Sequence, residues 1–202
     1  MAKSLRMFNF LNMKVGALYE VIITSIDDRG RPHAAPMGVR IVGDSAFLMK
    51  SYGETRTLSN LKALGRGVLN VVDEVEPFFY CIFEQSKLSF DWSTELPVLR
   101  GAVAWSPFNL LEASKKGDYY EVSCSITSVH VKRGKPKPLC RAESSLLESL
   151  IHYTRLRYYE DLGLKEEVSK LKSLILQHLD IVERTGWPRL KSLAKKLKKK
   201  LH

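Results

Sequence analysis

Apolar and polar residues alternate along most of the first two thirds of the chain, with Gly, Pro and Asp between the alternating stretches. A period of two, in segments rich in β-branched and aromatic residues, is typical of strands with one buried face. In the longest such segment, 119–131, one side carries Tyr120, Val122, Cys124, Ile126 and Ser128. The predicted strands are 15–26, 34–42, 46–50, 68–72, 86–91, 98–105 and 119–131. Many short strands and few helices predict an antiparallel barrel.

The segments between these strands contain turn and break signals. Asp27–Pro32 is predicted to be a hairpin turn in which Gly30 adopts a positive φ. Pro97 and Pro107 are interpreted as breaks, because proline cannot donate to a strand ladder. The apolar run 78–83 is predicted to be helical or extended core.

The periodicity changes after Gly-Lys-Pro-Lys-Pro at 134–138, which can extend neither a ladder nor a helix. Beyond it, apolar residues recur every three or four positions, and this pattern predicts three amphipathic helices. Gly186 is expected near the C′ position that ends the second helix. The predicted apolar faces are Leu146, Leu147, Leu150, Ile151 and Thr154 in the first, Leu164, Val168, Leu171, Leu174, Ile175 and Val182 in the second, and Leu190, Leu193, Leu197 and Leu201 in the third.

A polar loop at 51–57 comes directly before a short helical pattern at 58–64, which Gly65 is expected to end. Its hydroxyls, its arginine and the unpaired N–H groups of a helix N-terminus are suited to a phosphate group. The simpler interpretation is a helix cap formed by Thr57 or Ser59, because caps are common and anion sites are rare. The local sequence favours the cap and leaves the phosphate site open.

Four motifs, in matching order and spacing, resemble the FMN-binding split-barrel proteins. They are Tyr19-Glu-Val-Ile-Ile-Thr, His33-Ala-Ala-Pro-Met-Gly-Val, Gly53-Glu-Thr-Arg-Thr-Leu-Ser-Asn-Leu and Val68-Leu-Asn-Val-Val-Asp. The likeness is greatest to an uncharacterised, largely archaeal branch known as domain of unknown function 447, and related branches include flavin reductases and pyridoxamine-phosphate oxidases. The resemblance implies a mainly β fold with α: an FMN-binding split β-barrel at 13–133, followed by a helical C-terminal subdomain with a basic tail at 140–202.

The same resemblance implies where FMN binds, in preference to FAD. The implied cofactor-binding residues are Ala35, Pro36, Met37, Gly38, Val39, Arg40, Ser51, Gly53, Glu54, Thr55, Arg56, Thr57, Asn60 and Asn70. Arg56 is expected to pair with the phosphate, and Lys50 and Arg40 are the alternatives. Related proteins are homodimers with FMN near the interface, so a homodimer is expected. Candidates for the shared surface, or else for the monomer core, are Phe78, Phe79, Phe83 and Trp105.

Two of these positions, Pro36 and Asn70, keep a structural alternative, and the neighbouring His33 is not assigned to the site. Pro36 indicates an edge, bulge or break in a strand, which is compatible with flavin docking or with no ligand. Asn70 lies among aliphatic residues and is expected to bind either backbone groups or a polar edge of the flavin. His33 is interpreted as a polar strand residue beside a turn.

The net charge of +10 comes mainly from the end of the chain. Residues 184–202 contain eight Lys or Arg and no acid, so the first 183 residues carry about +2. A nucleic-acid-binding barrel is therefore not indicated. The leucine-striped, lysine-rich tail fits a membrane surface or nucleic acid, and it fits equally a helix packed on its own protein with a solvated basic face.

Several classes of protein and site find no support. The sequence has no apolar run of membrane-spanning length and no signal peptide, which leads to the expectation of a cytoplasmic protein. The cysteines Cys81, Cys124 and Cys140 are far apart and predict neither a disulfide framework nor a metal site. Motifs of zinc proteases, α/β-hydrolases, P-loop NTPases and dinucleotide-binding folds are missing.

The predicted function is a flavin-dependent oxidoreductase, a reductase or an oxidase, acting on an unknown small molecule. No catalytic side chain is identified, which is compatible with flavin chemistry because the isoalloxazine itself transfers the electrons. One alternative is a non-enzymatic flavin-binding or electron-carrier protein. The other is an adaptor that binds nucleic acid or a membrane through its lysine-rich tail.

Overall fold

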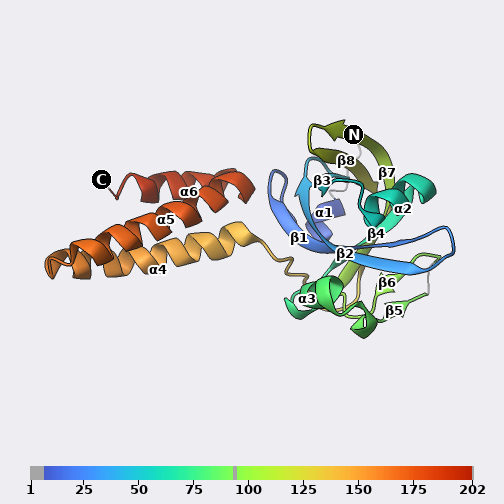
Figure 1. The fold of residues 1–202 in the computed structure, drawn as a ribbon, viewed down its shortest axis with the longest axis horizontal. Coiled ribbons are helices and arrows are strands. Elements are labelled where there is room, and N and C mark those ends of the chain that lie inside the picture. Colours follow the sequence, from blue (N-terminus) through green and yellow to red (C-terminus); the bar gives the residue numbers. More distant parts are fainter. Residues whose placement is uncertain (1–6, 93–94, 202) are drawn as a thin grey trace. The chain divides into compact units, whose positions relative to one another are not determined.

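The computed structural model describes residues 7–92 and 95–201, apart from the side chain of Arg157. The chain divides into two compact units. A barrel unit contains Tyr19–Leu139 and the residues up to Val15, and a helical unit contains Gly16–Leu18 and the chain from Cys140 onward. Figure 1 follows the course of the chain through each unit.

Seven strands form the main sheet of the barrel unit, and two short strands form a second sheet. The main sheet contains β1 (Leu18–Ile26), β2 (Pro32–Ile41), β3 (Ala46–Tyr52), β4 (Arg66–Val71), β7 (Ala104–Lys116), β8 (Tyr119–Ile126) and β9 (His130–Val131). The second sheet pairs β5 (Phe90–Asp91) with β6 (Val98–Leu99).

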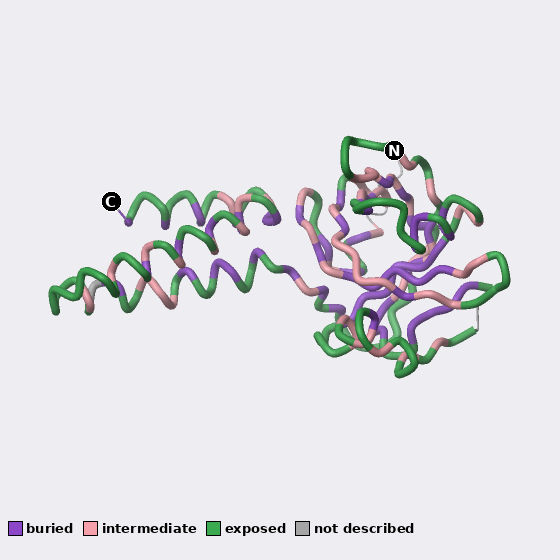
Figure 2. The backbone as a smooth tube through the Cα atoms, in the orientation of Figure 1, coloured by how far each residue is buried: buried purple, intermediate pink, exposed green. Residues whose placement is uncertain are grey.

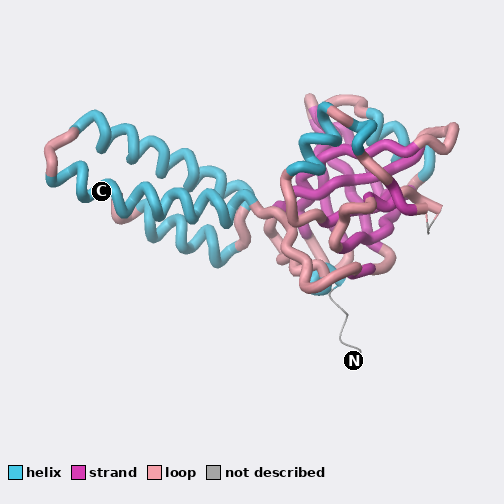
Figure 3. Tube along the Cα trace, turned by 90° about the horizontal axis from the view of Figure 1, so that it is seen from below, coloured by secondary structure: helices cyan, strands magenta, loops and turns pink. Residues whose placement is uncertain are grey.

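The main sheet closes on itself in the order β4-β1-β2-β3-β8-β7, and a β7–β4 pairing completes the ring, while β9 adds to β7. Closure removes the free edges that an open sheet would leave. Phe47 is fully buried and makes edge-on contacts with Phe8 and Phe108, whose ring centroids lie 6.2 and 5.2 Å away. The predicted antiparallel barrel is confirmed, and Figure 3 shows its strands.

The predicted strand 98–105 overlaps only the first two residues of the longest strand, β7, because Pro107 is interpreted as a break in the sequence. That interpretation is wrong, since Pro107 lies within β7 and faces Val68 of β4. Its carbonyl accepts hydrogen bonds from the main-chain N–H of Thr127, at 2.9 Å, and from the Thr127 hydroxyl, at 3.1 Å. The proline thus contributes an acceptor to the sheet although it has no N–H to donate.

The short helices of the barrel unit are α1 (Met7–Phe10), α2 (Arg56–Leu64), α3 (Glu76–Phe83) and the 3₁₀ helix η1 (Gln85–Lys87). Gly65 ends α2 as predicted, with φ of +73° and its N–H donating to Leu61 O at 2.8 Å. Both α2 and α3 pack against β2. The apolar run at 78–83 is helical, and three of its six residues remain exposed: Phe79, Ile82 and Phe83.

The helical unit consists of α4 (Arg141–Asp161), α5 (Lys165–Thr185) and α6 (Pro188–Lys198). Helix α5 packs along α4, and α6 packs against both. The three helices were predicted, but the apolar face assigned to α4 is partly wrong. Leu147 and Leu150 are 58% and 45% exposed, and Thr154 is exposed, whereas the buried positions are Ala142, Ser145, Leu146, Ser149 and Leu156. Leu164 and Leu193 are also exposed.

Gly186 ends α5 for a different reason from the one predicted. Its φ is −77°, so it does not occupy the left-handed C′ conformation. A Cβ at this position would lie 2.7 Å from the carbonyl oxygen of Val182 and 3.3 Å from the Cβ of Leu190. Glycine is needed here because the chain turns from α5 into α6 in very close contact.

All three cysteines are buried free thiols, and they lie on α3, on β8 and just before α4. Burial raises the pKa of Cys81 to about 11 and that of Cys124 to about 12. Among the described helices, none is both long and apolar enough to cross a membrane.

Candidate functional site

The polar loop before α2 is built around Ser51 and Thr55. The Ser51 hydroxyl lies 2.8 Å from that of Thr55 and also donates to the carbonyl of Gly53, whose φ is +80°. Thr55 is the N-cap of α2, because its hydroxyl accepts a hydrogen bond from Leu58 N at 3.3 Å. The predicted caps Thr57 and Ser59 are therefore wrong, since both lie inside the helix.

The cap leaves two early N–H groups of α2, those of the exposed Arg56 and the buried Thr57, without a carbonyl inside the helix. Thr55 satisfies the N–H of Leu58, while these two come too early in the helix to find a carbonyl within it. These N–H groups lie at the positive end of the helix dipole. Arg56 is exposed, so its guanidinium is accessible to solvent.

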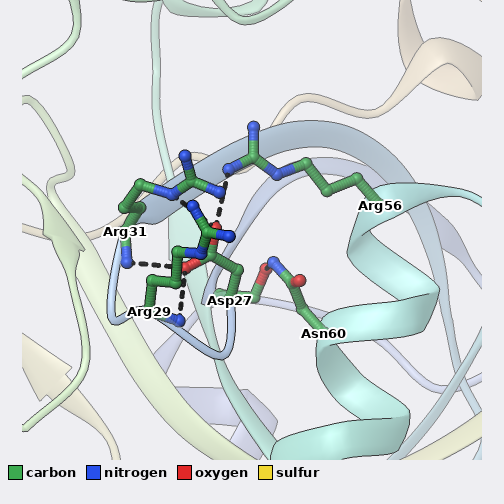
Figure 4. A network of polar contacts seen from close by, with 6 residues as sticks. Asp27, Arg29, Arg31, Arg56 and Asn60 are labelled. Atoms are coloured by element: carbon green, nitrogen blue, oxygen red, sulfur yellow. Dashed lines mark hydrogen bonds and ion pairs between the residues drawn. The ribbon is translucent and has the colours of Figure 1, made fainter.

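A carboxylate in the β1–β2 hairpin fixes Arg56. Asp27 Oδ2 lies 3.3 Å from Arg56 Nη2 and 2.8 Å from Arg31 Nε, and Oδ1 accepts from the main-chain N–H groups of Arg29 and Arg31. The hairpin is closed by Gly30, which has the predicted positive φ of +74°. Figure 4 shows Arg29, Arg31 and Arg56 gathered around Asp27. With the exposed Asp28 included, residues 27–31 and Arg56 carry three positive and two negative charges, a formal charge of +1.

The Asp27 side chain is only 9% exposed. Burial alone would raise the pKa of this carboxyl, but hydrogen bonds from the main chain and side chain of Arg31, from Arg29 N–H, and the Arg31 charge lower the pKa to about 2. Asp27 is therefore ionised at any pH near neutrality and holds the two guanidinium groups in place.

Asn60 connects α2 to the barrel. Its Nδ2 donates to Ser25 Oγ at 3.0 Å, and both residues are buried. The contact fixes the first turns of α2 over β1, close to the charged hairpin (Figure 4).

Glu54 turns away from this surface. Its carboxylate pairs with Lys62 Nζ at 2.8 Å, and Lys62 lies 4.4 Å from the ring centroid of Tyr120. Hydrogen bonds from Lys62 and Tyr120 lower the pKa of Glu54 below its ordinary value. The loop thus keeps its one acid paired on the side of β8, so the acid does not oppose an anion at Arg56.

The predicted ring-binding segment, 35–40, lies on β2. Val39 is buried, and the other five residues of the segment are half-buried. Strand β3 pairs with β2 at Val39, Arg40 and Ile41, so Pro36 lies outside that paired stretch, as expected for a residue without an N–H. The residues 35–38 therefore lie on the part of β2 beyond its pairing with β3, and they are partly accessible to solvent.

His33 lies on β2, two residues before this segment. Its Nδ1 is buried and has no hydrogen-bond partner among the described residues. Burial lowers the pKa of His33 from its ordinary value, and the charge of Arg56 lowers it further, so the ring is neutral near pH 7. A buried ring nitrogen without a partner is uncommon, and because it is covered by the protein an outside group could reach it only after a local rearrangement.

Asn70 takes the backbone role that the sequence left open. It is fully buried, its Nδ2 lies 3.0–3.2 Å from Ile22 O, Thr24 Oγ1 and Val68 O, and its Oδ1 accepts from Leu99 N at 2.9 Å. Both ends of the amide are therefore engaged inside the barrel.

The structure brings most of the implied residues into two groups, and Glu54 and Asn70 face elsewhere. The first group is the N-terminus of α2 and the second is the accessible part of β2, which α2 contacts. Sequence reasoning missed Asp27 and Arg31, which organise the charge of the first group. The hairpin motif Asp-Asp-Arg-Gly-Arg was interpreted only as a turn, and its mixture of one inward acid with arginines was the available signal.

The fold is shared with proteins of known structure. An FMN-bound protein from Methanosarcina mazei is 20% identical over 96% of this chain and 98% of its own, with a TM-score of 0.53. A flavin reductase-like protein with a split barrel domain from Shewanella frigidimarina gives 17% identity, 63% and 72% coverage, and a TM-score of 0.52. Nitrilotriacetate monooxygenase component B from Mycobacterium thermoresistibile is 16% identical over 66% of this chain and 78% of its own, with a TM-score of 0.51. At these identities the likeness establishes the fold, and the predicted split barrel is confirmed.

Two family descriptions match consecutive parts of the sequence. Residues 19–133 match "Protein of unknown function (DUF447) N-terminal domain", and residues 140–199 match "Protein of unknown function (DUF447)". Together they span the barrel and the three helices that follow it. The chain therefore belongs to the DUF447 family, as the four sequence motifs indicated.

Proposed function

We propose that this protein is an FMN-binding flavoprotein and that it acts as a flavin-dependent oxidoreductase on a small molecule. The observation that carries the proposal is the cationic N-terminus of α2 beside the partly accessible residues 35–38 of β2. The DUF447 protein from Methanosarcina mazei that shares this fold is FMN-bound, which supports the same cofactor here.

The residues present fit FMN in two respects. One terminal phosphate matches a net positive surface that has helix N–H groups without a carbonyl partner in the helix and exposed arginines, Arg56 among them. A flat, polar-edged ring matches the half-buried residues 35–38 of β2. Glu54 does not interfere, because Lys62 neutralises it.

The proposed roles follow from these positions. Arg56 and the first N–H groups of α2 hold the phosphate, and Asp27 keeps Arg56 in place. The segment 35–40 supports the ring. When bound, FMN supplies one- or two-electron transfer, while the chain positions the ring and controls what reaches it.

The direct test is reconstitution of the purified protein with FMN and with FAD, followed by visible absorption and flavin fluorescence. We expect one FMN per chain and weaker binding of FAD, because the cationic surface is built for a single phosphate. Absence of saturable FMN binding to folded protein would contradict the proposal.

Turnover distinguishes an enzyme from a carrier. NAD(P)H oxidation by the reconstituted protein, in the presence of free flavin or a quinone as acceptor, is expected for an oxidoreductase. A protein that binds FMN, accepts electrons from dithionite and shows no turnover with any donor is instead an electron carrier.

We also propose a homodimer that covers the exposed side of the flavin. Helix α3 packs against β2 and presents an exposed apolar surface formed by Val75, Phe79, Ile82 and Phe83. Phe83 is 69% exposed, and its ring centroid lies 4.9 Å from that of Phe79. Such clustering favours contact with a second copy. Phe78 and Trp105, by contrast, are half-buried in the core of one chain.

A further inference from the structure

Positive charge is concentrated in one helix of the helical unit. Residues 140–185 contain seven basic and eight acidic residues, whereas residues 186–202 contain seven basic residues and no acid. Among the described residues, no ion pair joins a lysine or arginine of 189–200 to a carboxylate, although α4 and α5 pair Lys172 with Glu160 and Arg184 with Asp180. Within the described part of the unit, the lysines and arginine of α6 are therefore not engaged in ion pairs.

The apolar side of α6 is already occupied. Leu190, Ala194, Leu197 and Leu201 are 1–9% exposed, and α6 packs against α4 and α5. Tyr153 of α4 also donates its hydroxyl to the carbonyl of Lys200 at 3.5 Å. Figure 2 shows the buried positions of α6 recurring between exposed ones.

The packing of α6 favours one of the two partners that the sequence analysis allows for the tail, a membrane surface or nucleic acid. An amphipathic helix binds a bilayer by inserting its apolar face, and in α6 that face is committed to the protein, with Leu193 the one exposed leucine. Nucleic-acid phosphates need only the cationic face. Single strands are held by a cationic groove combined with aromatic stacking, and α6 itself contains no aromatic residue between the lysines, although Trp187 precedes its first residue.

We propose that the basic face of α6 binds double-stranded nucleic acid through its phosphate backbone, without reading the sequence. Lys191, Lys195 and Lys198 are spaced i, i+4 and i+7 and so share one side of the helix. Lys195 and Lys198 are exposed and Lys191 is half-buried, and exposed Lys199 lies beside them. Lysines act as point charges. Recognition of base edges in the grooves needs side chains with paired donors or acceptors, and the lysine side of α6 has none.

The test uses the full chain and two labelled 20-base-pair duplexes of unrelated sequence, with fluorescence anisotropy measured between 50 and 200 mM KCl. We expect equal affinity for both duplexes and a slope of log K against log salt of about −3 to −4, from about −0.9 per phosphate contact. The triple variant Lys191→Gln, Lys195→Gln, Lys198→Gln should make the slope shallower by about 2.7.

The control replaces three exposed lysines elsewhere, Lys137, Lys165 and Lys170, with Gln, and therefore has the same net charge as the triple variant. It should bind duplex like the unchanged protein, and circular dichroism should show both variants folded. Equal loss in the control would attribute binding to overall charge and overturn the proposal.

Two other results would also overturn it. One is the absence of salt-sensitive duplex binding at 50 mM KCl. The other is tighter binding to phosphatidylserine vesicles than to either duplex, which would make the basic face a membrane contact. Both outcomes are independent of FMN binding, because flavin fluorescence is measured separately.

Discussion

Asp27 is a residue whose contribution extends beyond its own hairpin. Its carboxylate is the shared partner of Arg31 and Arg56, and through Arg56 it connects the β1–β2 turn to the start of α2. An acid beside an anion site would ordinarily weaken it. Here the acid aligns the cations, and the surrounding charge stays positive.

The pKa of Asp27 predicts a specific dependence of stability on pH. The folded value of about 2 lies below the ordinary value of 3.8, so the carboxylate stabilises the folded state above about pH 4 and loses this contribution as the pH falls toward 2. The difference in melting temperature between the unchanged protein and Asp27→Asn should therefore be constant from pH 7 to about 5 and shrink below about pH 4. A difference that is the same at pH 6 and pH 2 would show that Asp27 is not held in this network.

Arg56 is the side chain expected to contribute most to phosphate binding. Arg56→Ala should weaken FMN binding by about 1.5–3 kcal/mol, or about ten- to a hundredfold, because a charge-assisted bond is lost. Lysine should restore part of the affinity, since it lacks the planar fork. The control is Arg66→Ala, an exposed arginine that pairs with Glu95 beyond the other end of α2. If Arg56→Ala bound FMN with unchanged affinity, the phosphate would instead be bound by Lys50 or Arg40.

Asn70 is expected to affect the fold directly. Asn70→Ala leaves Leu99 N–H and the carbonyl of Ile22 buried without their partner, and should lower the free energy of unfolding by about 2–4 kcal/mol. Urea denaturation measures the change, and Asn109→Ala, at an exposed position on β7, should stay within about 0.5 kcal/mol. If Asn70→Ala left the free energy of unfolding unchanged but abolished FMN binding, Asn70 would instead belong to the cofactor site.

At the scale of the element, the junction between α5 and α6 requires a residue without a side chain, Gly186. Gly186→Ala should destabilise the helical unit by about 1–3 kcal/mol, because the new methyl group meets Val182 O and Leu190 Cβ. Thermal unfolding followed by circular dichroism gives the comparison with Gly101→Ala. Gly101 has open space around its Cβ position and no positive φ, so that control should be close to neutral.

The sequence predicted elements well where the local signals were strong. The hairpin at Gly30, the end of α2 at Gly65 and the three C-terminal helices all depend on contacts within a few residues. Most of strand β7 was missed because Pro107 carries a local break signal, which its two sheet neighbours override. The exposed leucines of α4 were assigned to the wrong face because periodicity cannot tell which of two apolar stripes meets a neighbour.

The same distinction holds for the candidate site: features within one segment were predictable, and contacts between distant segments were not. The Ser51–Thr57 loop was identified from its residue types, and the resemblance indicated the β2 segment. The partner of Arg56 could not be predicted, because Asp27 lies 29 positions away in sequence and meets Arg56 only after the barrel closes. Likewise, the choice between backbone and ligand for Asn70 depends on Ile22 and Leu99, which belong to other strands.

At the scale of the whole molecule, the exposed surface of α3 predicts self-association. Phe83→Glu should convert a dimer into a monomer at micromolar concentration, because a charge would replace an aromatic ring in the shared surface. Light scattering with FMN bound measures the mass. Val131→Glu, at an exposed apolar position on β9, is the matched control and should remain dimeric. A monomeric unchanged protein that still binds FMN would contradict the shared surface.

The three buried thiols allow local opening of the structure to be measured by the rate at which each is chemically labelled. Thiol reagents attack the thiolate, and burial suppresses it at Cys81 and Cys124, so labelling requires the surrounding structure to open first. Cys81 lies on α3, Cys124 in the barrel wall and Cys140 at the entrance to α4. The rates at which the unmodified chain takes up label at these three positions therefore measure separately how often the α3 surface, the barrel and the helical unit open. Slower labelling of Cys81 in the presence of FMN would indicate that the cofactor tightens the α3 surface.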